Sequence, residues 1–136
     1  MKIVLDENAY IPTKAHLEDA GFDLYSPISV VIPKRSYVSI DTGVHIQIPS
    51  GMVGFLKSKS GLNVKHSILS EGVIDCGYTG TIVVKLYNHS DIDYTIEKGN
   101  KITQIVFLPI PSITLKQVES IENSDRGNNG FGSSGK

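Results

Sequence analysis

The segment GFGSSGK, residues 130–136, matches two patterns that bind phosphate in other proteins. Gly130, Gly132 and Gly135 satisfy G-x-G-x-x-G, while Gly130, Gly135 and Lys136 satisfy G-x-x-x-x-G-K without its final Ser or Thr. Both patterns deliver phosphate to the N-terminus of a helix that follows, where free amides and the helix dipole favour an anion. Lys136 is the last residue of the sequence, so neither pattern has its usual helix.

Three other places carry polar residues that could do chemistry, and each has a simpler alternative. Ser60 and Gly61 open a possible helical turn and could bind phosphate, although Ser is also a good helix N-cap. Asp75 follows an apolar strand and could be a general base, although an Asp entering a turn often bonds only its own backbone. Gln104 lies in a predicted strand, where its amide could bind a ligand or face solvent.

Cysteine and histidine give little support for metal or thiol chemistry. Cys76 is the single cysteine, so an internal disulfide is excluded, and we favour a small packed residue over a nucleophile. The four histidines stand far apart, without the spacing of zinc ligands. We therefore expect no structural zinc site.

Length and charge indicate one domain without a nucleic-acid or membrane surface. The 136 residues carry 13 Lys and Arg against 14 Asp and Glu, so no basic field attracts phosphate polymers or anionic lipid. The first ten residues contain only a three-residue apolar run before Asp6, too short for a signal peptide or a membrane span. We expect a cytoplasmic protein.

Strand patterns dominate the chain and predict an all-β fold. Apolar side chains alternate at Val44, Ile46 and Ile48 and again in residues 82–86, and turn residues punctuate the runs. Residues 60–67 are the best helix candidate. Many short strands of this kind favour a sandwich or barrel. The predicted strands cover residues 29–33, 37–49, 51–59, 81–88 and 101–110.

The composition changes at Asn123, after which ten of the last fourteen residues are Gly, Asn or Ser. Phe131 is the only large apolar residue there, so the segment cannot bury enough surface to offset its ordering entropy. We expect a barrel domain at 1–122 and a flexible arm at 123–136. An arm that carries Arg126 and a phenylalanine amid glycines suggests closure over a site, although a solubilising tail is the simpler alternative.

Five stretches, taken together, resemble the five motifs of the trimeric dUTPases in order and spacing across the whole chain. The resemblance implies a jelly-roll-like β-barrel of the dUTPase type, and a homotrimer whose active sites are shared between subunits. It implies Mg²⁺-dependent hydrolysis of dUTP to dUMP and pyrophosphate, which lowers dUTP and supplies dUMP for thymidylate synthesis. The stretches are AGFDLYS (20–26), SKSGL (58–62), GVIDCGYTG (72–80), GNKITQIV (99–106) and RGNNGFGSSG (126–135).

The same resemblance assigns roles to individual residues. Asp75 would orient and deprotonate the water that attacks the α-phosphorus, and Asp23 would contact Mg²⁺ through a coordinated water. Tyr78 would pack under the deoxyribose and exclude a 2′-hydroxyl, and Phe131 would stack on the base. The full set of substrate-binding residues implied is Lys59, Ser60, Gly61, Gly72, Ile74, Tyr78, Val83, Gln104, Arg126, Phe131, Gly132, Ser133 and Ser134.

Several positions depart from the family pattern. Lys59 replaces the usual Arg, which keeps the charge but loses the bidentate fork, and Ser58 replaces the Pro before it. Gly77 replaces a second Asp after Asp75. The usual Asp-Arg of the fourth motif is Asn-Lys at 100–101.

Two alternatives remain. The dCTP deaminases share the fold and a D-x-G-aromatic stretch, but their catalytic Glu, seven residues after the aromatic, corresponds to Lys85 here. A regulatory protein that uses a dUTPase scaffold to contact a partner is the other alternative, because an interface leaves no fixed motif.

Overall fold

Apolar side chains that alternate along the sequence line the interior, as the sequence predicts. Val44, Ile46 and Ile48 are at most 6% exposed, whereas the intervening His45 is partly exposed. The alternating apolar residues of 82–86 are at most 1% exposed. Period-two alternation therefore marks the strands that have one face in the core.

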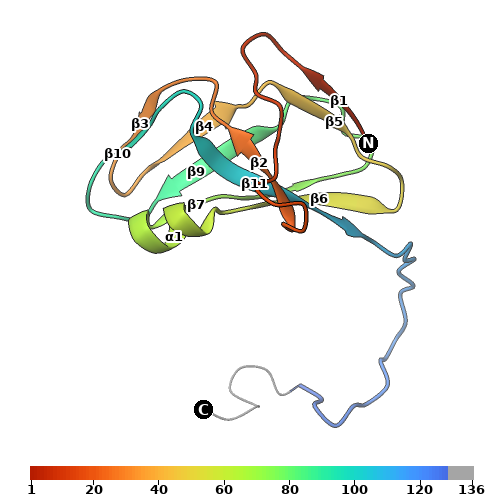
Figure 1. Cartoon of the computed structure of the whole chain (residues 1–136). Helices are drawn as coiled ribbons and strands as arrows, with labels where there is room; N and C mark the ends of the chain where they lie inside the picture. The colour runs from red at the N-terminus through yellow and green to blue at the C-terminus, as the bar shows by residue number, and fades with distance from the viewer. Residues whose placement is uncertain (129–136) are drawn as a thin grey trace.

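The computed structural model describes residues 1–128, which form eleven strands and one short helix (Figure 1). The elements are β1 (Lys2–Leu5), β2 (Gly21–Tyr25), β3 (Val30–Ile32), β4 (Tyr37–Asp41), β5 (Val44–Gln47), β6 (Met52–Lys57), α1 (Ser60–His66), β7 (Ile68–Leu69), β8 (Glu71–Ile74), β9 (Val83–Asn88), β10 (Tyr94–Ile96) and β11 (Lys101–Pro109).

Every strand pair of the described chain is antiparallel, and the strands enclose one apolar core. The strand orders are β2-β11-β6-β8, β4-β9-β7, β1-β5 and β10-β3. Buried apolar residues from nine of these strands or their flanks form a single cluster. The predicted all-β fold is confirmed.

The nine-residue strand β11 lies between β2 and β6 and sets the register of both. Gln104 on β11 faces Asp23 on β2 and Lys57 on β6. Its neighbours Thr103 and Ile105 are fully buried, which anchors the strand in the core. Register in this sheet therefore brings three stretches that are far apart in sequence to one place.

The structure differs from the predicted elements in two ways: it has strands β1, β2, β7, β8 and β10 outside the predicted ranges, and it breaks one predicted strand in two. The continuous stretch predicted for 37–49 is two strands, separated at Thr42 and Gly43. Gly43 has φ +64°, and the buried Thr42 hydroxyl donates a hydrogen bond to the carbonyl of Ile82 at 2.7 Å. A left-handed residue interrupts the strand, and the glycine accommodates it at little cost.

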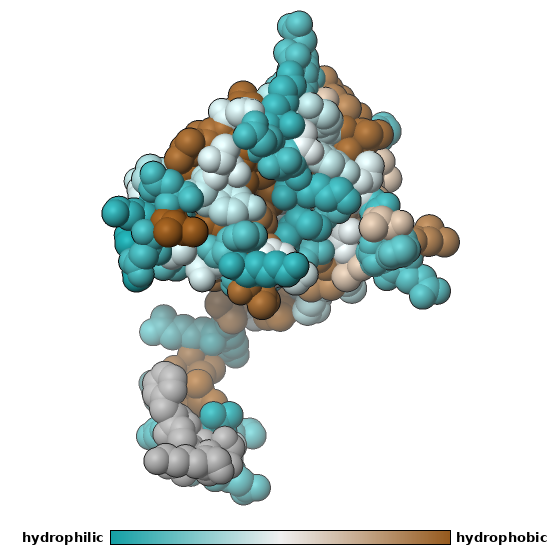
Figure 2. All heavy atoms as spheres, turned by 60° about the vertical axis from the view of Figure 1, so that its left-hand side comes forward, coloured by the Kyte–Doolittle hydropathy of each residue, from teal (hydrophilic) through white to brown (hydrophobic). Residues whose placement is uncertain are grey.

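Residues 110–128 follow β11 without a helix or strand, and they run away from the barrel (Figure 1). All of them are exposed, and apolar side chains are visible on this segment in Figure 2. Among residues 1–128, no helix is long and apolar enough to cross a membrane. The large apolar side chains of the segment are Ile110, Ile113, Leu115, Val118 and Ile121.

A substitution at Gly54 tests the packing of the core. A Cβ at this position on β6 would lie 2.9 Å from Cδ1 of Ile105, which is fully buried and has little room to move. We expect Gly54→Ala to lower the free energy of unfolding by about 1 to 3 kcal/mol, measured by urea unfolding. Gly61→Ala is the matched control, because nothing lies within 4 Å of its Cβ and alanine favours a helix. Equal stability of the two variants would contradict this account.

Candidate active site

One buried carboxylate with two lysines forms the charged part of the site. Asp23 on β2 accepts an ion pair from Lys59, just after β6, at Oδ1 and another from Lys101, at the start of β11, at Oδ2. The distance from Lys101 Nζ to Asp23 Oδ2 is 2.8 Å. The side chain of Asp23 is only 9% exposed. Because two ammonium groups share one carboxylate, the cluster carries a net positive charge.

The two lysines determine the ionisation of Asp23. Burial alone would raise its pKa, but the hydrogen bonds and charges of Lys101 and Lys59 outweigh that effect and lower the pKa below its ordinary value of 3.8. Asp23 is therefore ionised at neutral pH.

Ser60 and Gly61 open the seven-residue helix α1, and the chain before them is fixed by the adjacent strands. The N-cap is Lys59, without a side-chain capping bond, so the alternative that Ser60 caps the helix is wrong. The Ser58 hydroxyl donates to the carbonyl of Ser70 at 3.1 Å and accepts from its amide at 2.8 Å. These two bonds hold the start of α1 against the β7–β8 junction.

Gln104 lies across the sheet rather than simply facing solvent. Its Nε2 donates to the carbonyl of Ser58 at 3.4 Å. A Cβ at Gly21 would lie 2.7 Å from its Oε1, so the amide side chain occupies the space that the glycine leaves open. Gln104 therefore lies beside the entrance to α1, together with Lys59.

Asp75 begins a tight turn after β8. The amide of Tyr78 donates to the carbonyl of Asp75 at 3.2 Å, and Gly77, the third residue of the turn, has φ +97°. A positive φ at that position is typical of a type II turn and favours glycine. The Asp75 side chain is exposed, and among residues 1–128 no side chain or amide bonds its carboxylate. The departure at Gly77 thus fits the turn conformation, and the carboxylate of Asp75 does not cap its own backbone.

The ring of Tyr78 folds back over the residues that follow it. Its hydroxyl donates to the carbonyl of Thr81 at 2.8 Å. A Cβ at Gly80 would lie 2.5 Å from the hydroxyl oxygen, so only a glycine leaves room for the ring. Tyr78 remains 45% exposed, so part of its surface is accessible from solvent near Asp75.

Three other predicted residues flank this turn. Gly72 and Ile74 lie on β8, opposite Leu56 and Gly54 of β6. Val83 begins β9 and is 49% exposed. Ile74 and Val83 form a second group with Asp75 and Tyr78, at the β8–β9 connection, whereas Gly72 lies on β8 between this group and the first.

The two groups lie at opposite ends of the β6–β8 ladder. Ile74 pairs with Gly54, whereas Glu71 pairs with Lys57, three residues nearer to Ser60. Strands advance about 3.3 Å per residue, so this offset alone is about 10 Å. In Figure 1, β9 begins at the end of the barrel away from α1. The structure of one chain therefore does not bring Asp75 to the phosphate-binding candidates.

The predicted residues of the arm are described only in part. Arg126 lies in the exposed segment that leaves the barrel. Phe131, Gly132, Ser133 and Ser134 lie outside the described residues.

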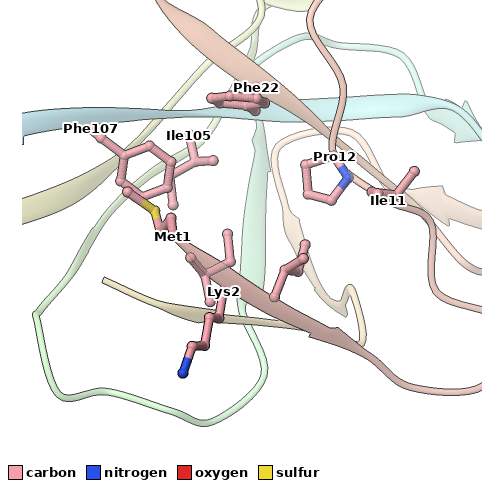
Figure 3. Close-up of a pocket in the computed structure, with 9 residues that line it drawn as sticks. Met1, Lys2, Ile11, Pro12, Phe22, Ile105 and Phe107 are labelled. Atoms are coloured by element: carbon pink, nitrogen blue, oxygen red, sulfur yellow. The ribbon is translucent and has the colours of Figure 1, made fainter. Parts of the chain in front are cut away.

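An apolar cavity of about 280 Å³ lies elsewhere, between β1, β2 and β11 (Figure 3). Phe22, Phe107 and Ile105 line one side of it, and Met1 and Lys2 line the other. It contains no residue of either candidate group and no carboxylate. Its chemistry suits apolar packing rather than nucleotide hydrolysis.

Comparison with known proteins extends the likeness over nearly the whole chain. The family model described as dUTPase matches residues 7–135. The chain belongs to the dUTPase family. A probable deoxyuridine 5′-triphosphate nucleotidohydrolase of Schizosaccharomyces pombe is 43% identical over 132 residues, covering 96% of this chain and 94% of that protein. The deoxyuridine 5′-triphosphate nucleotidohydrolase of Clostridioides difficile is 41% identical over 134 residues, with the same coverage of 96% and 94%.

Solved dUTPase structures match the fold closely. The dUTPase of Staphylococcus bacteriophage 80alpha, solved with dUpNHpp, superposes with a TM-score of 0.92 at 35% identity, covering 99% of this chain and 98% of that one. A point mutant of the phage phi11 dUTPase, solved to reveal coordination of a structural Mg(II) ion, has a TM-score of 0.82 at 32% identity and covers 90% and 98%. The fold is therefore that of the dUTPases.

Lys101 is a site residue that the sequence does not predict. It departs from the fourth motif of the family, and its ammonium group pairs with the buried Asp23. The available signal was a charged residue at the start of a strand, directly after the turn at Gly99 and Asn100. That signal does not reveal which carboxylate the lysine meets.

The ion cluster predicts a pH dependence of stability. A carboxylate whose pKa is lowered in the folded state stabilises that state above its unfolded pKa, and the contribution is lost as pH falls through the folded pKa. We expect Asp23→Asn to lower the free energy of unfolding by about 1 to 3 kcal/mol at neutral pH, because two ammonium groups lose their partner. Urea unfolding at neutral and acid pH measures this difference, which should shrink in acid. A constant difference would show that Asp23 is not ionised in the folded protein.

Proposed function

We propose that this chain hydrolyses dUTP to dUMP and pyrophosphate by attack of water on the α-phosphate, lowering dUTP and supplying dUMP for thymidylate synthesis. The observation that carries the proposal is family membership across residues 7–135, with candidate residues gathered beside the start of α1 and in one tight turn. Curated relatives with over 90% coverage are named for this reaction.

The phosphate chain would be bound beside the Asp23 cluster. Lys59 and Lys101 supply positive charge there, and the buried Asp23 fixes their ammonium groups in position. The Ser60 hydroxyl, the Gly61 amide and Gln104 would donate hydrogen bonds to phosphate oxygens. Positioning and charge neutralisation are the main contributions to catalysis of phosphoryl transfer.

Water activation and nucleoside selection belong to the other group. The exposed carboxylate of Asp75 would hold the attacking water and accept its proton. The Tyr78 ring would pack under the deoxyribose where a 2′-hydroxyl would clash, and the backbone near Val83 would bond the uracil edge. Gly72 and Ile74 would line the same pocket.

Mg²⁺ fits this site as an ion that arrives with the triphosphate. Residues 1–128 contain no group of three or more His, Cys, Asp or Glu side chains that could hold a metal ion. Both Asp23 oxygens already pair with lysines, so Asp23 would contact the ion through one of its waters. Mg²⁺ characteristically keeps several waters and binds through substrate phosphates. When bound, it would supply charge neutralisation at the phosphate oxygens.

A homotrimer with shared sites is part of the proposal. Asp75 and Ser60 lie at opposite ends of one ladder, so a complete site requires the Asp75 group of another copy. The exposed apolar segment 110–121 and the free edge of β1 offer surfaces for such assembly, because exposed apolar patches mark interfaces. The arm at 123–136, with Arg126, Phe131, Gly132, Ser133 and Ser134, would close over the bound nucleotide. We place the protein in the cytoplasm, where a single unpaired cysteine is common.

The deaminase alternative fails on the position of Lys85. Its Nζ lies 3.8 Å from the centre of the Tyr37 ring and 5.0 Å from that of Tyr87, so its charge is directed to two tyrosines. An ammonium group there cannot replace the acid/base Glu of that family.

A regulatory role on the same scaffold remains the second candidate. The phage 80alpha dUTPases are described as controlling transfer of virulence genes. Pyrophosphate release separates the two candidates: we expect it from dUTP with Mg²⁺ and not from dCTP or UTP. An absence of release from dUTP would favour the regulatory role.

Asp75→Asn should retain the fold and nucleotide binding and remove most turnover. An amide is nearly isosteric but cannot take a proton from water, so we expect kcat for dUTP to fall about 10²- to 10⁴-fold. Glu71→Gln is the matched control, since it neutralises an exposed carboxylate on β8, the strand that Asp75 follows. Turnover within a few-fold of the parent would exclude Asp75 as the base.

Truncation after Asn123 should separate stability from turnover. The described residues beyond Asn123 are exposed, so the barrel loses little buried area and its melting temperature should change little. We expect turnover to fall at least about tenfold, because misalignment of reacting groups is costly. Deletion of Lys136 alone is the control. Full-length rates in the truncated protein would indicate that the arm is a solubilising tail.

A further inference from the structure

A histidine outside the candidate site holds the turn that carries Tyr78. His45 on β5 contacts the carbonyl of Thr79 through Nδ1 at 2.8 Å. A second contact runs in parallel, because the Thr81 hydroxyl donates to Oδ2 of Asp41 at 3.0 Å. Residues of β4 and β5 therefore bind the β8–β9 connection on both sides of Gly80, at Thr79 and at Thr81.

The other ring nitrogen of His45 faces a carboxylate. Nε2 lies 3.3 Å from Oδ1 of Asp6, and the amide of Asp6 in turn donates to the carbonyl of Gly43 at 2.8 Å. Both ring nitrogens therefore face acceptors. A neutral imidazole has one N–H and can satisfy one of them, whereas the imidazolium satisfies both.

We propose that His45 is a positioning residue for sugar selection: by holding the Thr79 carbonyl, it keeps the Tyr78 ring where it excludes a 2′-hydroxyl. This inference rests on the proposed function, in which Tyr78 packs under the deoxyribose. His45 acts through the turn and touches no substrate.

The position of the Tyr78 ring depends on its turn, because the ring and its hydroxyl contact residues of the same connection. Its hydroxyl bonds the carbonyl of Thr81, and its ring occupies the space beside Gly80. Thr79 lies between Tyr78 and Gly80, so a shift of its carbonyl moves the ring and its support together.

Protonation of His45 strengthens its contacts with the Thr79 carbonyl and the Asp6 carboxylate. The hydrogen bond to Thr79 raises the pKa of His45, and although partial burial opposes this, Asp6 and Asp41 raise it further. A group with a raised folded pKa contributes fully at low pH, and the contribution is lost as pH rises through that pKa. Sugar selection should therefore weaken as pH rises.

The test compares the ratio of kcat/KM for dUTP to that for UTP across variants. His45→Ala removes both contacts, and we expect the ratio to fall about three- to tenfold, the range that one hydrogen bond confers. His45→Asn should restore most of the ratio, because its amide can donate to the Thr79 carbonyl. His16→Ala is the control, since His16 is exposed and forms its hydrogen bonds through its backbone amide and carbonyl.

A pH series distinguishes positioning from general stability. Between about pH 6 and pH 8.5, the ratio should fall for the parent and stay level for His45→Asn, which does not titrate. Asp6→Asn should move the midpoint of the parent curve to lower pH. A merely structural role would change melting temperature without changing the ratio or its pH dependence.

Gly80→Ala completes the design, because its Cβ displaces the Tyr78 ring directly. An altered ratio in Gly80→Ala with an unchanged ratio in His45→Ala would overturn the inference and leave the role of Tyr78 intact. A parent protein that does not prefer dUTP to UTP would instead overturn the proposed function.

Discussion

The fixed spacing of paired strands is the constraint on which the candidate site depends. One ladder, β6 with β8, carries Asp75 beyond one end and Ser60 beyond the other. The offset is fixed, because each residue of a paired strand adds about 3.3 Å along the ladder. In the proposed function, the distance between the Asp75 carboxylate and the proposed phosphate-binding residues would therefore be set by how copies of the chain assemble.

In the proposed function, the charged cluster of Asp23, Lys59 and Lys101 would hold positive charge in place for an anion. Lysine side chains are flexible and lose conformational entropy when they are fixed. Asp23 fixes two of them at once, and it does so from a position with little solvent. The net charge remains positive because one carboxylate is shared.

Features with a local sequence pattern could be predicted, whereas contacts between residues far apart in the sequence could not. Alternation at Val44, Ile46 and Ile48 and the helix at 60–67 were predicted because both signals lie within a few residues. The break at Gly43 was missed because a single left-handed residue leaves the apolar alternation on either side intact. Short strands such as β1 and β10 offered too few residues for a pattern.

The candidate site shows the same difference between local and long-range features. Asp75 and Tyr78 were proposed from the order of five stretches, and the structure places them in one turn. His45 was not, because its partners are 34 and 39 residues away and nothing local marks it. The roles of Phe131, Gly132, Ser133 and Ser134 remain predictions, since these residues lie outside the described chain.

The exposed apolar segment after β11 has a consequence for behaviour in dilute solution. Five large apolar side chains between Ile110 and Ile121 lie in water in the isolated chain, with exposures from 46% to 94%. Their burial in an assembly would couple folding to association by mass action. The melting temperature would then rise with protein concentration, and dilution alone would weaken the enzyme. At low concentration these exposed side chains would also favour nonspecific aggregation, because an apolar patch left in water is an aggregation liability.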